Sequence, residues 1–160
     1  WRLEMTGVDV GDRWETLGQQ AEETLGDQML AFTDTHVTMA LARTGRGEAL
    51  ARHRQTLAER ADGKGWAAEL SADATLPIAD AIAAYFAGDY DRAVDGFLAC
   101  REEWPRVGGS HAQRDLYSQA LLDAAVKAGR TQLAESLLAE RGANHPTSRG
   151  VAFWRDQVAA

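Results

Sequence analysis

The strongest constraint on the fold is a glycine turn that recurs three times along the chain. The turns span 44–47, 87–90 and 128–131, and their first glycines lie 43 and 41 residues apart. Around the second and third turns, apolar residues recur every three or four positions, which is typical of amphipathic helices. Glycine readily adopts the left-handed backbone that ends a helix. Each turn therefore predicts an antiparallel helical hairpin. Because no segment alternates apolar and polar residues, we expect little or no sheet.

The predicted hairpins have more apolar surface than each can cover alone. Helical spacing is clearest around the second turn, at Ile78, Ile82 and Tyr85 before it and at Ala93 and Phe97 after it. The first hairpin is weaker, because polar side chains interrupt the apolar stripe of its second helix. A lone hairpin leaves an apolar face in contact with water, so neighbouring hairpins must stack.

The segment Gly-Asp-Tyr-Asp-Arg-Ala at 88–93, followed by Phe97 and Pro105, resembles a tetratricopeptide repeat (TPR). That repeat has small residues where its helices cross, an aromatic residue four positions later, and a closing proline. These places are taken here by Ala81, Ala84, Ala93, Phe97, Cys100 and Pro105, and in the next unit by Ala125, Ala134, Leu138 and Pro146. The first unit departs from the pattern, because His53 or Arg54 stands at the aromatic position. All units are also longer than the usual repeat of about 34 residues. The resemblance implies an all-α, right-handed superhelical stack of TPR-like hairpins.

Three further segments resemble the tetratricopeptide repeat protein 38 family. They are Asp-Thr-His at 34–36 followed by Met39-Ala40, the segment 108–115 (Gly-Gly-Ser-His-Ala-Gln-Arg-Asp), and 134–141 (Ala-Glu-Ser-Leu-Leu-Ala-Glu-Arg). The match covers most of the chain, and the double-glycine segment is its most specific part. Members of that family are much longer, with helical repeats upstream. A chain that opens at Trp1 rather than Met therefore suggests a fragment. The family's biochemical role is poorly defined, so the resemblance predicts a fold more than an activity.

We expect one helical domain over 1–160. Its N-terminal part would hold a helix capped by Asp12 and the remnant of a preceding repeat, and its end a capping helix opened by Thr147 or Ser148. Residues 62–75 are predicted to form a long connection with a short helix around Trp66 and Leu70. The predicted parts are 1–30 for the N-terminal helix and remnant, 31–61, 76–105 and 113–146 for the hairpins, and 147–160 for the capping helix.

Composition excludes several classes of protein. The chain has 24 acidic and 17 basic residues, a formal net charge of −7, and no run of Lys or Arg, which argues against a nucleic-acid binder. No apolar run approaches the roughly 18 residues of a membrane span. The single cysteine, Cys100, excludes an internal disulfide framework and a cysteine-based zinc site, and we predict that it is buried packing. With no recognisable leader, the prediction is a cytoplasmic protein.

Catalytic motifs are present only as near misses. The glycines at 45–47 lack a preceding strand and a third glycine, and those at 63–65 lack the Ser or Thr of a phosphate loop. The segment 108–112 lacks the closing glycine of a nucleophile elbow, and no HExxH motif exists. We therefore predict a protein that is not an enzyme and holds no metal or cofactor. His53 and His145 are interpreted as surface or spacer residues.

Six residues are the candidates for ligand or partner binding. His36 and His111 fall in the first turns of first helices, which line the concave groove in TPR stacks. Ser110 and Gln113 form a predicted capping box, and a helix N-terminus flanked by His111 and Arg114 would accept a carboxylate or phosphate. In the competing interpretation Arg114 turns inward to an acidic neighbour, and Asp115 pairs with Arg114 or another helix. The six candidates are Asp34, His36, Ser110, His111, Arg114 and Asp115.

These observations favour a non-catalytic scaffold that binds a peptide or protein partner in its concave groove, with an acidic segment or carboxylate as the recognised group. The alternative is a small-molecule or enzymatic pocket built on Asp34, His36 and residues 110–115. Trp1, Leu3 and Met5 would also leave an apolar surface at the start of the chain, which favours self-association.

Overall fold

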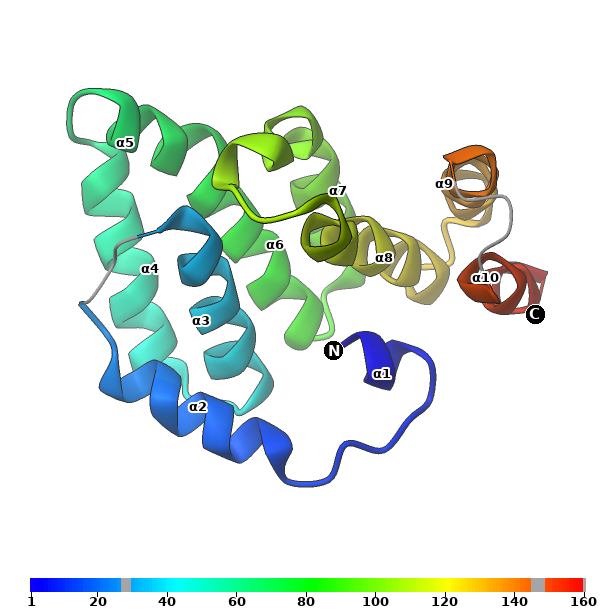
Figure 1. The fold of residues 1–160 in the computed structure, drawn as a ribbon, viewed down its shortest axis with the longest axis horizontal. Coiled ribbons are helices and arrows are strands. Elements are labelled where there is room, and N and C mark those ends of the chain that lie inside the picture. The colour runs from blue at the N-terminus through cyan, green and yellow to red at the C-terminus, as the bar shows by residue number, and fades with distance from the viewer. Residues whose placement is uncertain (27–29, 145–148, 160) are drawn as a thin grey trace.

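The computed structural model describes residues 1–26, 30–144 and 149–159, and all regular structure in these ranges is helical (Figure 1). The all-α class predicted from the sequence is therefore confirmed. In chain order the elements are α1 (Arg2–Met5), α2 (Arg13–Glu23), α3 (Ala31–Arg43), α4 (Gly47–Ala61), α5 (Trp66–Leu70), the π-helix η1 (Ser71–Thr75), α6 (Leu76–Phe86), α7 (Tyr90–Ala99), the 3₁₀ helix η2 (Arg101–Val107), α8 (His111–Lys127), α9 (Thr131–Asn144) and α10 (Arg149–Ala159).

The three glycine turns join α3 to α4, α6 to α7 and α8 to α9. Gly45, Gly88 and Gly129 all have positive φ angles, of 68°, 81° and 70°. In each turn the N–H of the residue after the glycine donates to the carbonyl five positions back, at 3.0, 3.0 and 2.9 Å. This bond satisfies a carbonyl that the end of the helix would otherwise leave without a partner. The same combination of a glycine with positive φ and one backbone hydrogen bond thus reverses the chain direction at all three turns.

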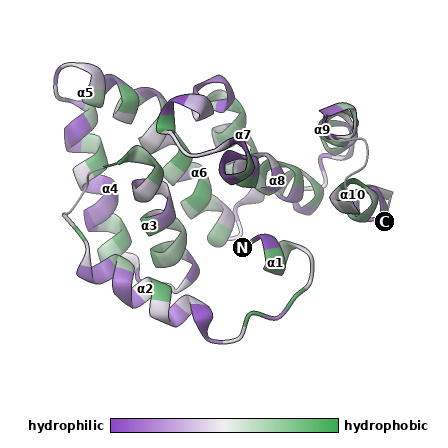
Figure 2. Ribbon diagram, viewed as in Figure 1, coloured by the Kyte–Doolittle hydropathy of each residue, from purple (hydrophilic) through white to green (hydrophobic). Residues whose placement is uncertain are grey.

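Helix α6 lies at the centre of the molecule and packs against α3, α4 and α7. Figure 2 shows that it is hydrophobic along most of its length, and Ile78 and Ile82 are fully buried. Small residues allow the close crossing of α6 and α7, since a Cβ atom added to Gly96 would lie 3.0 Å from that of Ala81. Phe97 fills the core beside this crossing.

The connection predicted over 62–75 is limited to 62–65. Helix α5 begins at Trp66 and continues through η1 into α6 without a break. Pro77 has no N–H to donate to the carbonyl of Asp73, and the preceding turn is widened so that the Leu76 N–H donates to the Ser71 carbonyl. The sequence indicated a connection up to residue 75 with Pro77 in the first turn of the next helix, whereas the wider turn accommodates the proline inside a longer helix.

Helix α10 packs against α9 near the C-terminal end of the chain, with Val151 and Trp154 buried. A C-terminal helix is therefore present, as the sequence predicted. The proposed caps Thr147 and Ser148, together with His145 and Pro146, lie outside the described residues.

Candidate functional site

An apolar groove of about 750 Å³ lies between α1, α2, α3 and the start of α8. Figure 1 shows the helices that form it, with α2 passing along one side of α3 and α1 on the side of α8. Its apolar lining consists of Trp1, Leu3, Trp14, Leu17, Ala21, Val37, Met39, Ala40 and Leu116. Its polar lining consists of Arg2, Gln20, Glu23, Thr24, Thr33, His36 and Gln113.

The groove exposes leucine side chains that a core would cover. Leu17 of α2 is 47% exposed and Leu3 of α1 is 56% exposed, although both lie beside apolar neighbours. The sequence places Leu17 on the same helix face as Trp14 and Ala21, and Ala21 is buried against α3. The stripe therefore faces the protein, but the described residues leave Leu17, in its middle, 47% exposed. Apolar surface of this kind, bordered by polar groups, is typical of interaction sites.

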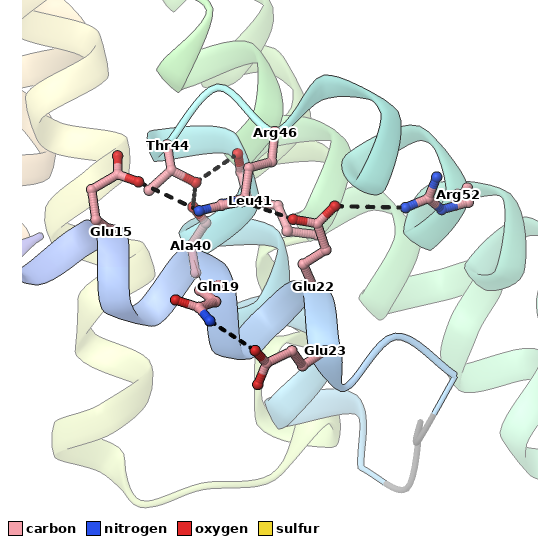
Figure 3. Close-up of polar contacts among 9 residues, drawn as sticks. All are labelled: Glu15, Gln19, Glu22, Glu23, Ala40, Leu41, Thr44, Arg46 and Arg52. Carbon is pink, nitrogen blue, oxygen red and sulfur yellow. Dashed lines mark hydrogen bonds and ion pairs between the residues drawn. The ribbon is translucent and has the colours of Figure 1, made fainter.

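Contacts with the turn between α3 and α4 hold α2 in place as one wall of the groove (Figure 3). The Arg46 guanidinium pairs with Glu22 at 2.7 Å and with Glu15 at 3.4 Å. Gly18 lies against Thr44 so closely that an added Cβ atom would be 2.5 Å from the threonine Oγ1. The position of this wall thus depends on a glycine and on ion pairs at one turn.

The opposite wall is held by the short helix α1. The Trp1 ring contacts the rings of Tyr85 and Phe86, with centroids 4.8 Å apart in both pairs. Glu4 pairs with Arg43 at the end of α3, at 2.7 Å. Partial burial alone would raise the pKa of Glu4, but its hydrogen bonds, chiefly from Arg43, lower it below the usual value. The predicted apolar surface at the chain start is thus partly covered.

His36 lies on the rim of this groove. Its Nδ1 is 2.8 Å from the carbonyl oxygen of Phe32, and its ring contacts the Phe32 ring, with centroids 4.3 Å apart and planes tilted by 51°. A carbonyl only accepts hydrogen bonds, so Nδ1 carries the proton and donates. The exposed histidine therefore keeps Nε2 as an acceptor when the ring is neutral.

Three of the candidates on α8, His111, Arg114 and Asp115, line a second cavity, the arginine cleft, of about 1080 Å³ between η2, α8 and the end of α9; Ser110 is the N-cap of α8 and does not line it. The predicted capping box is confirmed, because the Ser110 hydroxyl accepts from the Gln113 N–H at 3.3 Å and the Gln113 side chain accepts from the Ser110 N–H at 2.8 Å. The cleft is lined by Arg2, Arg101, Glu102, Trp104, Pro105, His111, Ala112, Arg114, Asp115, Ser118, Glu140, Arg141 and Asn144.

Arg114 and Asp115 are both engaged within the protein. Arg114 donates to the carbonyls of Gly108, at 3.1 Å, and Gly109, so it closes the preceding loop. Asp115 accepts two hydrogen bonds from Arg141 of α9, at 2.6 and 2.9 Å. Burial alone would raise the pKa of Asp115, but the bonds from Arg141 and from a glutamine on α8 lower it below the usual value. The carboxylate thus joins α8 to α9.

Asp34 lies in neither of these cavities. Its side chain is 2% exposed and accepts a hydrogen bond from Arg60 of α4 at 2.7 Å. The structure therefore separates the candidate residues. Asp34 lies inside the protein, His36 lines the apolar groove, Ser110 caps α8, and the arginine cleft is lined by His111, Arg114 and Asp115. Arg2 lines both cavities, because it donates to the carbonyls of Ala112 and Gln113 at the start of α8.

A cluster of the buried Tyr85 and Asp123 with the exposed Lys127 has the residue types of an acid–base site. The Asp123 carboxylate accepts from the Tyr85 hydroxyl and pairs with Lys127 at 2.7 Å. Burial and the Asp123 charge raise the pKa of Tyr85 to about 12, so its hydroxyl stays protonated at neutral pH. The lysine lies over the Tyr85 and Tyr90 rings, at 4.8 and 5.4 Å. The cluster therefore joins α6 to α8, and the lysine also contacts α7.

His53 is buried, contrary to the surface role expected from sequence. Only 2% of it is exposed, and Nε2 lies 3.0 Å from the Asp34 carbonyl oxygen. The ring thus fills the position at which the other hairpins have an apolar side chain. Burial lowers the pKa of His53 below its usual value, while the bond to Asp34 opposes this shift.

This burial predicts an acid dependence of stability. In the unfolded chain His53 titrates near pH 6.5, whereas the folded protein binds that proton only at lower pH. The stabilisation that comes from keeping His53 neutral is therefore fully present above about pH 6.5. It is lost as the pH falls toward the lower pKa that His53 has in the folded protein. We expect His53→Phe to reduce the loss of unfolding free energy between pH 7 and pH 5, measured by urea denaturation. If the unfolding free energy fell by the same amount between pH 7 and pH 5 in the unmodified protein and in His53→Phe, the prediction would be contradicted.

No protein-family model matches this chain, and no solved structure matches it. Over residues 1–26, 30–144 and 149–159, no three His, Cys, Asp or Glu side chains gather closely enough to hold a metal ion. In the same ranges, no helix has the length and apolar character needed to cross a membrane. Burial raises the pKa of the Cys100 thiol, which lies in the core.

Proposed function

We propose that this chain is a non-catalytic binding scaffold whose apolar groove accommodates a peptide segment of a partner protein. The observation that carries the proposal is the exposure of Leu3 and Leu17 on the walls of a 750 Å³ groove that also contains Trp14. Exposed leucines in the same groove as a tryptophan are suited to receive apolar side chains, and aromatic residues contribute strongly to such interfaces.

The proposal includes the finer architecture suggested by the sequence. The three hairpins would form a TPR-like superhelical stack related to the tetratricopeptide repeat protein 38 family, and the groove would lie on its concave face. Two features support it: the three turns share one hydrogen-bonding pattern, and Ala93, Phe97 and Cys100 are buried at the positions that the repeat pattern assigns to packing.

The charges around the groove suggest the chemistry of the bound segment. Arg2 lies where the apolar groove meets the arginine cleft, and His111 and Arg114 line the cleft beyond it. Glu23 lies on the α2 side of the groove. A segment with apolar residues followed by an acidic residue or a terminal carboxylate would place its acid near Arg2, away from Glu23. We therefore propose an amphipathic segment with an acidic end as the partner's contribution.

The groove can be tested with the fluorescent probe anilinonaphthalene sulfonate, which joins apolar rings to an anionic group. We expect the probe to bind the full chain and Leu17→Asp to weaken binding about tenfold or more, because the apolar contact is replaced by a charge. The matched control is Leu30→Asp, since Leu30 is 64% exposed and does not line the groove. Undiminished binding by Leu17→Asp, or an equal loss in both variants, would overturn the assignment.

A peptide experiment tests the segment itself. Peptides selected from a random library on the unmodified chain, with counter-selection on Leu17→Asp, should share apolar residues followed by an acidic residue. Arg2→Gln should then weaken the selected peptides more than versions with the acid changed to its amide. Peptides without apolar residues, or with affinity independent of Leu17, would contradict the proposed function.

A further inference from the structure

Helix α1 is attached to the rest of the protein in the way that a tethered peptide is. It is joined to α2 through the non-helical segment 6–12, which Figure 1 shows as a long connection. Apart from Val10, residues 6–12 are exposed, and among the described residues their hydrogen bonds are made with residues 2–15. Helix α1 can therefore leave its place without breaking a hydrogen bond between this segment and the other helices.

Four side chains hold α1 in place. The Trp1 ring contacts two aromatic rings of α6, the Glu4 carboxylate pairs with Arg43 of α3 at 2.7 Å, and Met5 is buried. Residues three and four positions apart lie on the same face of a helix, so positions 1, 4 and 5 form one contact face. Arg2 donates to backbone carbonyls at the start of α8. The contact face thus combines an aromatic ring, an acid and an apolar side chain.

Helix α1 does not fill the space in which it lies. A cavity of about 320 Å³ remains between α1 and the four helices that it faces, lined on their side by Arg43, Tyr85, Phe86, Tyr90 and Lys127. The apolar groove borders α1 as well, and the Trp1 side chain lines both the groove and this cavity. A segment with empty space beside it makes fewer packing contacts than a core helix, so its release costs less free energy.

We infer that the surface under α1, formed by Arg43 of α3, Tyr85 and Phe86 of α6 and the start of α8, is a peptide-binding site that α1 itself occupies. A segment of a partner protein replaces α1 there when it carries the same pattern: a large aromatic residue, an acidic residue three positions later and an apolar residue next to the acid. The aromatic ring meets the two rings of α6, and the acid meets Arg43. The inference does not rest on the proposed function, because it concerns the surface under α1 rather than the apolar groove.

Competition between α1 and a free peptide provides the test. A segment tethered by a short linker acts at an effective concentration of the order of millimolar, so α1 weakens the binding of a peptide to the same surface. A variant that loosens α1 should therefore strengthen peptide binding, whereas a variant that damages an ordinary site weakens it. The probe is an N-acetylated peptide of residues 1–8 with a C-terminal fluorescein, and fluorescence polarisation measures its affinity for the full chain.

We expect Trp1→Ala in the full chain to bind the peptide at least about tenfold more tightly than the unmodified chain does. The control is Trp66→Ala, which should leave the affinity unchanged, because Trp66 is 67% exposed and lines neither the apolar groove nor the cavity under α1. If Trp1→Ala does not fold, Glu4→Lys replaces it, since a lysine there is repelled by Arg43 and also loosens α1. Equal peptide affinity in the unmodified, loosened and control chains would overturn the inference.

A charge reversal tests where the peptide binds. In the Trp1→Ala chain, Arg43→Glu should weaken the peptide about fivefold or more, and a peptide with Glu4→Arg should bind this double variant better than the original peptide does. If Leu17→Asp removed binding and Arg43→Glu did not, the peptide would lie in the apolar groove, which would overturn the inference and leave the proposed function standing. Dimers of the unmodified chain that the peptide dissociates would identify α1 of a second copy as the occupant and overturn the assignment to a partner protein.

Discussion

Replacing Asp34 by alanine is expected to lower the free energy of unfolding by about 3–5 kcal/mol. The Asp34 side chain is almost fully buried and accepts a hydrogen bond from Arg60 at 2.7 Å, which joins α3 to α4. Its removal leaves the Arg60 guanidinium without this carboxylate and opens space between the two helices. Urea unfolding monitored by circular dichroism measures the change, with a lower midpoint and an unchanged slope.

The control for this prediction is a similar pair at the surface. Asp80 accepts two hydrogen bonds from Arg54, also between helices, but the side chains are 29% and 51% exposed. Exposed pairs contribute about 1 kcal/mol or less, so Asp80→Ala should change stability little. If Asp34→Ala unfolded no more readily than Asp80→Ala, the buried pair would not be a structural link. That result would instead favour the role in ligand binding that the sequence predicted for Asp34.

The local parts of the fold could be predicted because neighbouring residues determine them. Glycine at 45, 88 and 129 ends a helix whatever packs around it, and Ser110 with Gln113 closes a cap within one turn. The widened turn before Pro77 could not be predicted, because a proline usually indicates a helix start. Only the continuous burial of α5, η1 and α6 against α4 makes the longer helix favourable.

The candidate site depends on how the helices cross, which one sequence does not determine. The sequence predicted both His36 and His111 in first turns; His111 does begin α8, but α3 begins at Ala31, so His36 lies in its second turn, and the two histidines line different cavities. The neighbours of His111 on the other face of α8, Gln113 and Leu116, line the groove instead. Likewise, the helical spacing places Leu17 on the inner face of α2, but it does not predict that Leu17 stays 47% exposed there. The groove is therefore recognised from the exposure of Leu17, which only the packing of the helices determines.

Gly109→Ala is expected to lower the free energy of unfolding by about 2–5 kcal/mol. Gly109 has a φ of 74°, a conformation that L-residues with a side chain rarely adopt. A Cβ atom there would also lie 2.7 Å from Cε2 and 2.9 Å from Cδ2 of the Phe32 ring. Phe32 belongs to α3 and its ring contacts the His36 ring, so the phenyl ring cannot move away without changing that contact. The backbone strain and the steric overlap therefore add.

Gly108→Ala separates these two causes. Gly108 has a φ of 92°, but a Cβ atom at this position meets nothing within 4 Å. With ψ −159°, Gly108 lies in a region that is essentially restricted to glycine, so the backbone strain alone should cost about 1–3 kcal/mol, less than strain and overlap together at Gly109. Thermal and urea unfolding of both variants measure the difference, and equal losses would show that the Phe32 contact does not matter.

The Gly109 substitution should also disturb the apolar groove. The contact between Phe32 and Gly109 and the buried hydrogen bond between Thr35 and Tyr117, at 2.7 Å, together position α3 against α8 and the loop before it. These are two of the elements that line the groove. Folded Gly109→Ala should therefore bind anilinonaphthalene sulfonate more weakly than folded Gly108→Ala. Unchanged probe binding by both variants would show that the double-glycine segment supports the fold without shaping the groove.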